Sequence, residues 1–164
     1  MKILVYTLIA ISFMSCEKGQ QENFPGSKGL YLVLVNTNGE NLLNPKTENS
    51  IDFNKVKRFC LIDGEYIEQY HGHLDHPKGC GIFDSEYAIG NIFATDLSGD
   101  INENSTSTTV IDWGNGDSDT IVATMNPDTN FPYSEFWYNG ISMKDFNEKL
   151  YGDENYYFEI SKDY

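Results

Sequence analysis

The segment that decides the fold reads TTVIDW-GNGDSD-TIVAT over residues 108–124. Two runs rich in β-branched residues flank a polar stretch of Gly, Asn, Asp and Ser, which is the composition of a β-hairpin. Two further turn signals, Asp63-Gly64 and Asn139-Gly140, also lie between apolar runs. Such dipeptides occupy tight hairpin turns because both central residues there take positive φ. The three segments together predict an antiparallel sheet.

Further strands are predicted on either side of these hairpins. Residues 30–35, Leu-Tyr-Leu-Val-Leu-Val, are apolar at every position, so we expect a central strand that is covered on both faces. Shorter strands are expected over 81–88, 92–95 and 156–160. Residues 145–150 could form a helix of one or two turns.

No long segment shows an apolar period of 3.6 residues, which would indicate amphipathic helices. The short strands alternate instead with turn residues, and residues 29–164 have the size of one domain. The sequence therefore predicts an all-β fold, an antiparallel β-sandwich of immunoglobulin-like or related Greek-key type.

The first residues have the pattern of an export signal. Residues 1–15 begin with Met1-Lys2, continue through a short apolar core and end in a small residue, Ser15. The sequence Phe13-Met14-Ser15-Cys16 resembles the lipobox of bacterial lipoproteins, which implies cleavage before Cys16 and lipid on its thiol. The alternative is an ordinary signal peptide with a chance cysteine. Residues 16–28 are polar and predict a flexible tether.

The charge of the chain excludes one class of partner. It has 11 Lys and Arg against 25 Asp and Glu, a formal net charge of −14. Such a field repels phosphate backbones, so nucleic acid is not an expected partner. No nucleophile elbow or other catalytic motif is found, and we do not expect an enzyme.

Two cysteines, Cys60 and Cys80, remain in the domain after Cys16. Disulfides persist in an exported protein, so we expect the two residues to pair. Spacing alone cannot bring two Cα atoms to bridging distance, so two buried free thiols are the alternative.

Two clusters could hold a metal ion. The histidines in His71-Gly72-His73-Leu74-Asp75-His76 are candidate ligands for zinc or copper, with an exposed loop as the alternative. A weak calcium site could form in the 108–124 hairpin, although Asp and Asn are also the residues that tight turns select. The candidate calcium ligands are Asp112, Asn115, Asp117 and Asp119.

Aromatic residues offer a third candidate site. Trp113, Trp137 and Tyr138, with Tyr133 nearby, could form a platform on which sugar rings stack. The alternative is that these side chains belong to the core of the sandwich. Solvent exposure distinguishes the two interpretations.

The Ser15-Cys16-Glu17-Lys18 sequence, the all-β pattern and the hairpins at 112–121 and 136–140 resemble small lipoproteins of the Bacteroidota. This resemblance implies a lipid-anchored location in the cell envelope and no particular activity. We expect a binding or structural module whose partners are the membrane, through Cys16, and an envelope protein or a glycan. A metal-binding or glycan-binding surface lipoprotein is the alternative.

Overall fold

The computed structural model describes residues 29–85, 90–125, 133–143, 148–151 and 155–164. The predicted signal peptide and tether, with Cys16, lie outside these residues. So does part of the predicted helix, and its remainder, residues 148–150, belongs to a strand. Within the described residues, no helix has the length and apolar character needed to cross a membrane.

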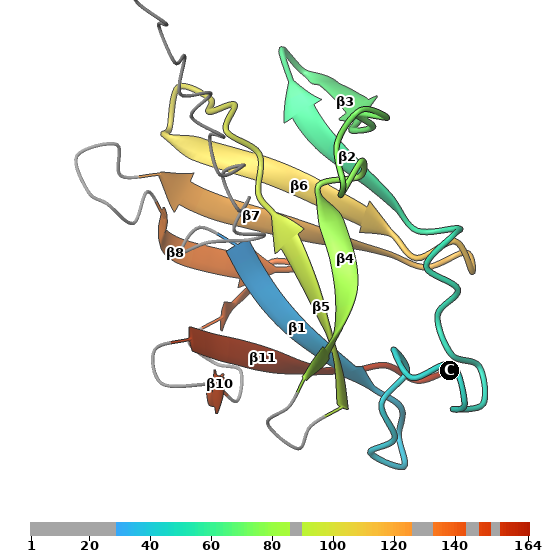
Figure 1. Cartoon of the computed structure of the whole chain (residues 1–164). Coiled ribbons are helices and arrows are strands. Elements are labelled where there is room, and N and C mark those ends of the chain that lie inside the picture. The colour runs from blue at the N-terminus through green and yellow to red at the C-terminus, as the bar shows by residue number, and fades with distance from the viewer. Residues whose placement is uncertain (1–28, 86–89, 126–132, 144–147, 152–154) are drawn as a thin grey trace, which may run out of the picture.

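The described residues form two β-sheets that face each other (Figure 1). This arrangement confirms the prediction of an all-β, sandwich-like fold. The five-stranded sheet has the order β10-β11-β1-β5-β4, and the six-stranded sheet has the order β3-β2-β6-β7-β8-β9. The strands are β1 Gly29–Val35, β2 Lys57–Ile62, β3 Glu65–Glu68, β4 Cys80–Ser85, β5 Gly90–Asp96, β6 Thr106–Asp112, β7 Ser118–Met125, β8 Tyr133–Tyr138, β9 Ile141–Ser142, β10 Glu148–Tyr151 and β11 Asn155–Ser161.

Strand β1 is central and covered on both faces, as its apolar sequence predicts. Its residues Leu30, Leu32 and Leu34 point into the main core between the sheets. On the opposite face, Val33 joins a second, smaller cluster with Ile92 and Tyr157. Because side chains alternate along a strand, a strand covered on both faces is apolar throughout.

The tight turns also form where their residues predict them. Asp63 and Gly64, between β2 and β3, have φ values of 50° and 85°. Asn139 and Gly140, between β8 and β9, have φ values of 49° and 78°. Both pairs therefore make the turn with two positive φ angles that matches the twist of the flanking strands.

One strand pair departs from the antiparallel prediction. Strand β11 pairs with β1 in parallel, with Leu32 opposite Phe158 and Leu34 opposite Ile160. Local turn signals cannot predict this pairing, because it joins strands from opposite ends of the domain. All other strand pairs among the described residues are antiparallel.

Candidate functional site

The β6–β7 hairpin supplies the frame of the candidate site. Burial alternates along both strands, so every second side chain points into the sandwich. On β7 the inward positions are Asp119, Ile121 and Ala123, all buried. This alternation places a carboxylate in the core beside apolar residues.

Side chains and glycines hold the turn between β6 and β7. The carboxylate of Asp112 accepts a hydrogen bond from the Gly114 amide at 2.8 Å, and the Asn115 side chain accepts one from the Asp117 amide at 3.0 Å. Gly114 and Gly116 have φ values of 73° and 94°, which side chains with a Cβ rarely adopt. The turn is therefore fixed by its own sequence.

The turn also packs closely against the loop that precedes β2. A Cβ atom at Gly114 would lie 2.3 Å from the Cβ of Lys55 and 2.8 Å from its carbonyl oxygen. Only glycine fits this approach. The loop and the turn are thus held together as two walls of one surface feature.

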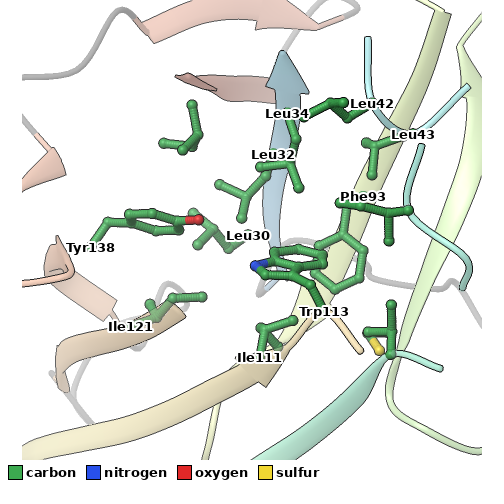
Figure 2. Close-up of a cluster of buried hydrophobic side chains, with 14 of the residues drawn as sticks. Leu30, Leu32, Leu34, Leu42, Leu43, Phe93, Ile111, Trp113, Ile121 and Tyr138 are labelled. Atoms are coloured by element: carbon green, nitrogen blue, oxygen red, sulfur yellow. The ribbon is translucent and has the colours of Figure 1, made fainter. Parts of the chain in front are cut away.

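The carboxylate of Asp119 is the centre of a buried polar network. Its Oδ2 atom accepts hydrogen bonds from the Trp113 indole nitrogen at 2.5 Å, the Lys162 ammonium at 2.6 Å and the Tyr138 hydroxyl. Its Oδ1 atom accepts one from the Asn139 amide at 2.7 Å. In Figure 2 the Trp113 indole lies beside Phe93, with its nitrogen turned to the side of Tyr138. The network joins β7, β8, the β8–β9 turn and the segment after β11.

These contacts keep the buried pair charged. Burial would raise the pKa of Asp119, but the hydrogen bonds from Lys162, Tyr138, Trp113 and Asn139 outweigh it and hold this pKa below its ordinary value. Burial would likewise lower the pKa of Lys162, and its bonds to Asp117 and Asp119 raise it instead. The pair is therefore a carboxylate and an ammonium over the neutral range of pH.

Next to this network lies a pocket of about 550 Å³, which we call the turn pocket. One wall is the β6–β7 turn from Trp113 to Asp117, and the opposite wall is the loop before β2. Trp113 and Asp117 belong to both the network and the pocket, so the buried charges support the pocket wall. The lining residues are Asn49, Ser50, Ile51, Asp52, Lys55, Trp113, Gly114, Asn115, Gly116, Asp117 and Tyr164.

Tyr164 forms a third side of the turn pocket. In Figure 1 the C-terminal end of the chain lies beside the loop before β2, which brings this residue to the pocket. The Tyr164 hydroxyl is buried and has no hydrogen-bond partner among the described residues. Burial raises the pKa of this hydroxyl, and the nearby Asn115 side chain and Lys162 ammonium lower it in part. Tyr164 thus lines the turn pocket and also packs against the main core.

The predicted disulfide is not formed. Cys60 lies on β2 of the six-stranded sheet and Cys80 on β4 of the five-stranded sheet, and both are buried free thiols. Cys80 belongs to the main core cluster and Cys60 does not, and spacing along the chain does not reveal how two cysteines lie relative to each other in the fold. Burial raises the pKa of the Cys80 thiol to about 11, so the thiolate that would react is disfavoured.

The three histidines lie in two different environments. The rings of His71 and His73 make an edge contact with centroids 6.3 Å apart, in an exposed loop. His76 instead packs its ring against Phe83, with centroids 5.6 Å apart. The described part of the chain holds no group of three His, Cys, Asp or Glu side chains that could bind a metal ion. Neither the proposed zinc or copper ligands nor the proposed calcium ligands form such a group.

The predicted sugar platform is wrong. Trp113 is 1% exposed and Tyr138 is 3% exposed, so neither offers a ring face to solvent, and only Trp137 is half-buried. Trp113 instead packs edge-on against Phe93 in the main core. The side chain of Tyr133 lies outside the described residues. The alternative interpretation, that these aromatic residues belong to the core, holds for Trp113 and Tyr138.

Sequence analysis placed Asp119 in the turn and missed its role in the core. The missing signal is its position in the alternation of β7, where it shares a face with Ile121 and Ala123. The pocket residues Asn49, Ser50 and Tyr164 were missed as well. They lie far from the hairpin in sequence, and no local pattern connects them to it.

Comparisons with known proteins found no match to this chain among protein-family models, curated proteins or solved structures.

Proposed function

We propose that this chain is a lipoprotein of the bacterial cell envelope and that its sandwich binds a small ligand in the turn pocket. The observation that carries the binding proposal is the pocket itself. Its volume of about 550 Å³ lies within the range of ligand sites in proteins. Its walls are held by the Gly114 contact and by the Asp119 network, so the pocket is formed before a ligand arrives.

The sequence supports the membrane part of the proposal. The Phe13-Met14-Ser15-Cys16 segment would place lipid on Cys16, and residues 16–28 would tether the domain to the membrane. Two or three acyl chains hold a protein stably on a bilayer, whereas one chain holds it only marginally. The membrane is thus the first proposed partner, and an envelope protein or a glycan is the second.

Metabolic labelling tests the anchor. Cells that express the chain would be fed an alkyne fatty acid, and the purified protein would be examined for the label and by mass spectrometry. Label is expected on the native chain and on a Cys60→Ser control, and none on Cys16→Ser. Label that persists in Cys16→Ser, or a native chain without lipid, would contradict the proposal.

A fragment screen by protein-observed NMR tests the binding site. Small polar compounds should shift the amide signals of Gly114 and Gly116 in the full chain. Ser50→Trp places a large side chain in the turn pocket and should abolish these shifts. Ser118→Trp is the matched control, because Ser118 is exposed in the same hairpin and does not line the pocket. A library that leaves both amides unshifted would overturn the binding proposal.

A further inference from the structure

The chemistry of the turn pocket restricts the ligand that it can take. Its charged side chains are paired with partners of opposite sign. The Lys162 ammonium lies 2.7 Å from the carboxylate of Asp117, and the Lys55 ammonium lies 3.9 Å from that of Asp52. Each charged side chain that lines the pocket therefore has a partner of opposite charge, although the whole chain carries a formal net charge of −14.

Neutral polar groups, in contrast, are free to bind. Among the described residues, the side chains of Asn49 and Ser50 have no hydrogen-bond partner. The Asn115 side chain uses its oxygen to cap the turn, and of its two amide N–H groups one faces the Tyr164 hydroxyl and the other can donate to a ligand. These groups come from both walls of the pocket. These side chains can donate hydrogen bonds to the hydroxyl groups of a ligand and accept hydrogen bonds from them.

An aromatic surface completes the pocket. Tyr164 is partly exposed and lines the pocket, while its hydroxyl is buried near Asp117 and Lys162. Ligand sites generally combine apolar or aromatic walls with a few polar groups that fix orientation. A sugar has the matching surface, because one face of its ring carries C–H groups and its rim carries hydroxyls.

We infer that the turn pocket binds an uncharged, hydroxyl-rich ligand, a sugar of one or two rings. The ring packs on Tyr164, and its hydroxyls bond to Asn49, Ser50 and Asn115. This inference rests on the proposed function, since it names the ligand of the same pocket. It does not involve the predicted platform of Trp113, Trp137 and Tyr138, and it uses Trp113 only as a buried part of the wall.

The test compares sugars that differ in charge. The full chain would be purified in a detergent without a sugar headgroup and in a buffer without polyols, which would compete for the site. D-Glucose, D-galactose, N-acetylglucosamine and cellobiose would be titrated by NMR, with D-glucuronate and D-glucosamine as the charged counterparts. At least one neutral sugar is expected to bind with shifts at Gly114 and Gly116, and at least tenfold more tightly than either charged sugar.

Two variants connect binding to the named side chains. Asn49→Gly removes the amide and keeps the fold, because Asn49 has a φ of 57° that glycine adopts freely. Loss of its hydrogen bond should weaken sugar binding about threefold to tenfold. Ser105→Gly is the matched control, since Ser105 is exposed, has a φ of 59° and lies outside the pocket. Its affinity should equal that of the native chain.

The outcomes separate this inference from the proposed function. Fragments that shift Gly114 and Gly116 while no neutral sugar does so would overturn the inference and leave the binding proposal intact. Tighter binding of glucuronate or glucosamine than of glucose would likewise overturn the inference and leave the binding proposal intact. Sugar binding that is indifferent to both Asn49→Gly and Ser50→Trp would place the sugar elsewhere and overturn the inference. Failure of every sugar and every fragment would overturn both proposals.

Discussion

The β6–β7 hairpin and the β2–β3 hairpin begin from similar sequence signals and end in different surroundings. Strands β6 and β7 lie inside the six-stranded sheet. Strand β7 carries the buried carboxylate of Asp119, and the turn between the two strands borders the turn pocket. Strand β3 is the edge of the same sheet, and every residue in it is exposed, with Tyr66 at 57%. Turn chemistry therefore predicts a hairpin, whereas neighbouring strands decide whether its side chains are buried or free.

The largest loss of stability is expected from a change in the buried part of the β6–β7 hairpin. Asp119→Ala would remove the buried acceptor that Lys162, Trp113 and Tyr138 share, and Lys162 would keep its bond to Asp117. The free energy of unfolding should fall by about 3–5 kcal/mol. Asp117→Ala is the charge-matched control. Asp117 is 35% exposed, so its loss should cost less than about 1 kcal/mol. Urea unfolding measures both, and equal losses would show that burial does not distinguish the two carboxylates.

The fold was largely predictable because its information is local. Alternating apolar residues and Asp-Gly or Asn-Gly turns predict the strands and two of the hairpins, and these features form in the structure. The parallel pairing of β1 with β11 was not predictable. It depends on which strands lie side by side after folding, and nothing in residues 30–35 identifies their neighbours.

The candidate site was much less predictable. Trp113 and Tyr138 were considered as a surface platform because aromatic residues serve both cores and binding sites. Cys60 and Cys80 were expected to pair because the chain is expected to be exported, but both are buried free thiols, and the expected compartment does not determine the distance between them. The turn pocket combines residues 49–55, 113–117 and 164, and only the folded chain brings these segments together.

A smaller loss of stability is expected from changing Arg58, which connects the two sheets near the exposed β2–β3 hairpin. Arg58 on β2 is 7% exposed and donates hydrogen bonds to the carbonyl oxygens of Lys78 at 2.8 Å and Asp96 at 2.9 Å. Arg58→Met should lower the free energy of unfolding by about 2 kcal/mol, because two acceptors lose a charged donor. Lys57→Met, on the solvent side of the same strand, should change it by less than about 0.5 kcal/mol. A larger loss in Lys57→Met would contradict this reasoning.

The pH dependence of stability sharpens the contrast further. The pKa of Asp119 is lower in the folded protein than in the unfolded chain, so its contribution is present above about pH 4 and is lost as the pH falls through the lowered pKa. The pKa of Lys162 is raised, so its contribution is lost as the pH rises above about 10 through that raised value. The buried carboxylate and the buried ammonium therefore limit the stability of the fold at opposite ends of the pH range.

Thermal unfolding of the native chain and of Asp119→Asn across the pH range would measure these contributions. The difference in stability between the two proteins should be constant at neutral pH and should shrink in acid. A difference that is unchanged at low pH would show that the Asp119 carboxylate does not carry the effect.

The smallest effect is expected in the exposed loop. His71→Ala combined with His73→Ala should change the free energy of unfolding by less than about 0.5 kcal/mol, because both side chains are exposed. Zinc should change the melting temperature of the native chain and of this variant by the same amount. His76→Ala should cost more, since it removes the contact with Phe83. Zinc stabilisation that disappears in the double variant would instead support metal binding by the loop.

The position of β1 has a consequence for when the domain can fold. Strand β1 is the first strand of the described chain, yet it lies between β5 and β11 in the finished sheet. Its parallel partner, β11, follows every other strand of the described chain, and pairing between such distant segments is slow because a long loop must close first. If the chain is exported as proposed, the five-stranded sheet stays incomplete until nearly all of it has crossed the membrane. The strand order would then keep the chain incompletely folded, which is the state that can pass through an export channel.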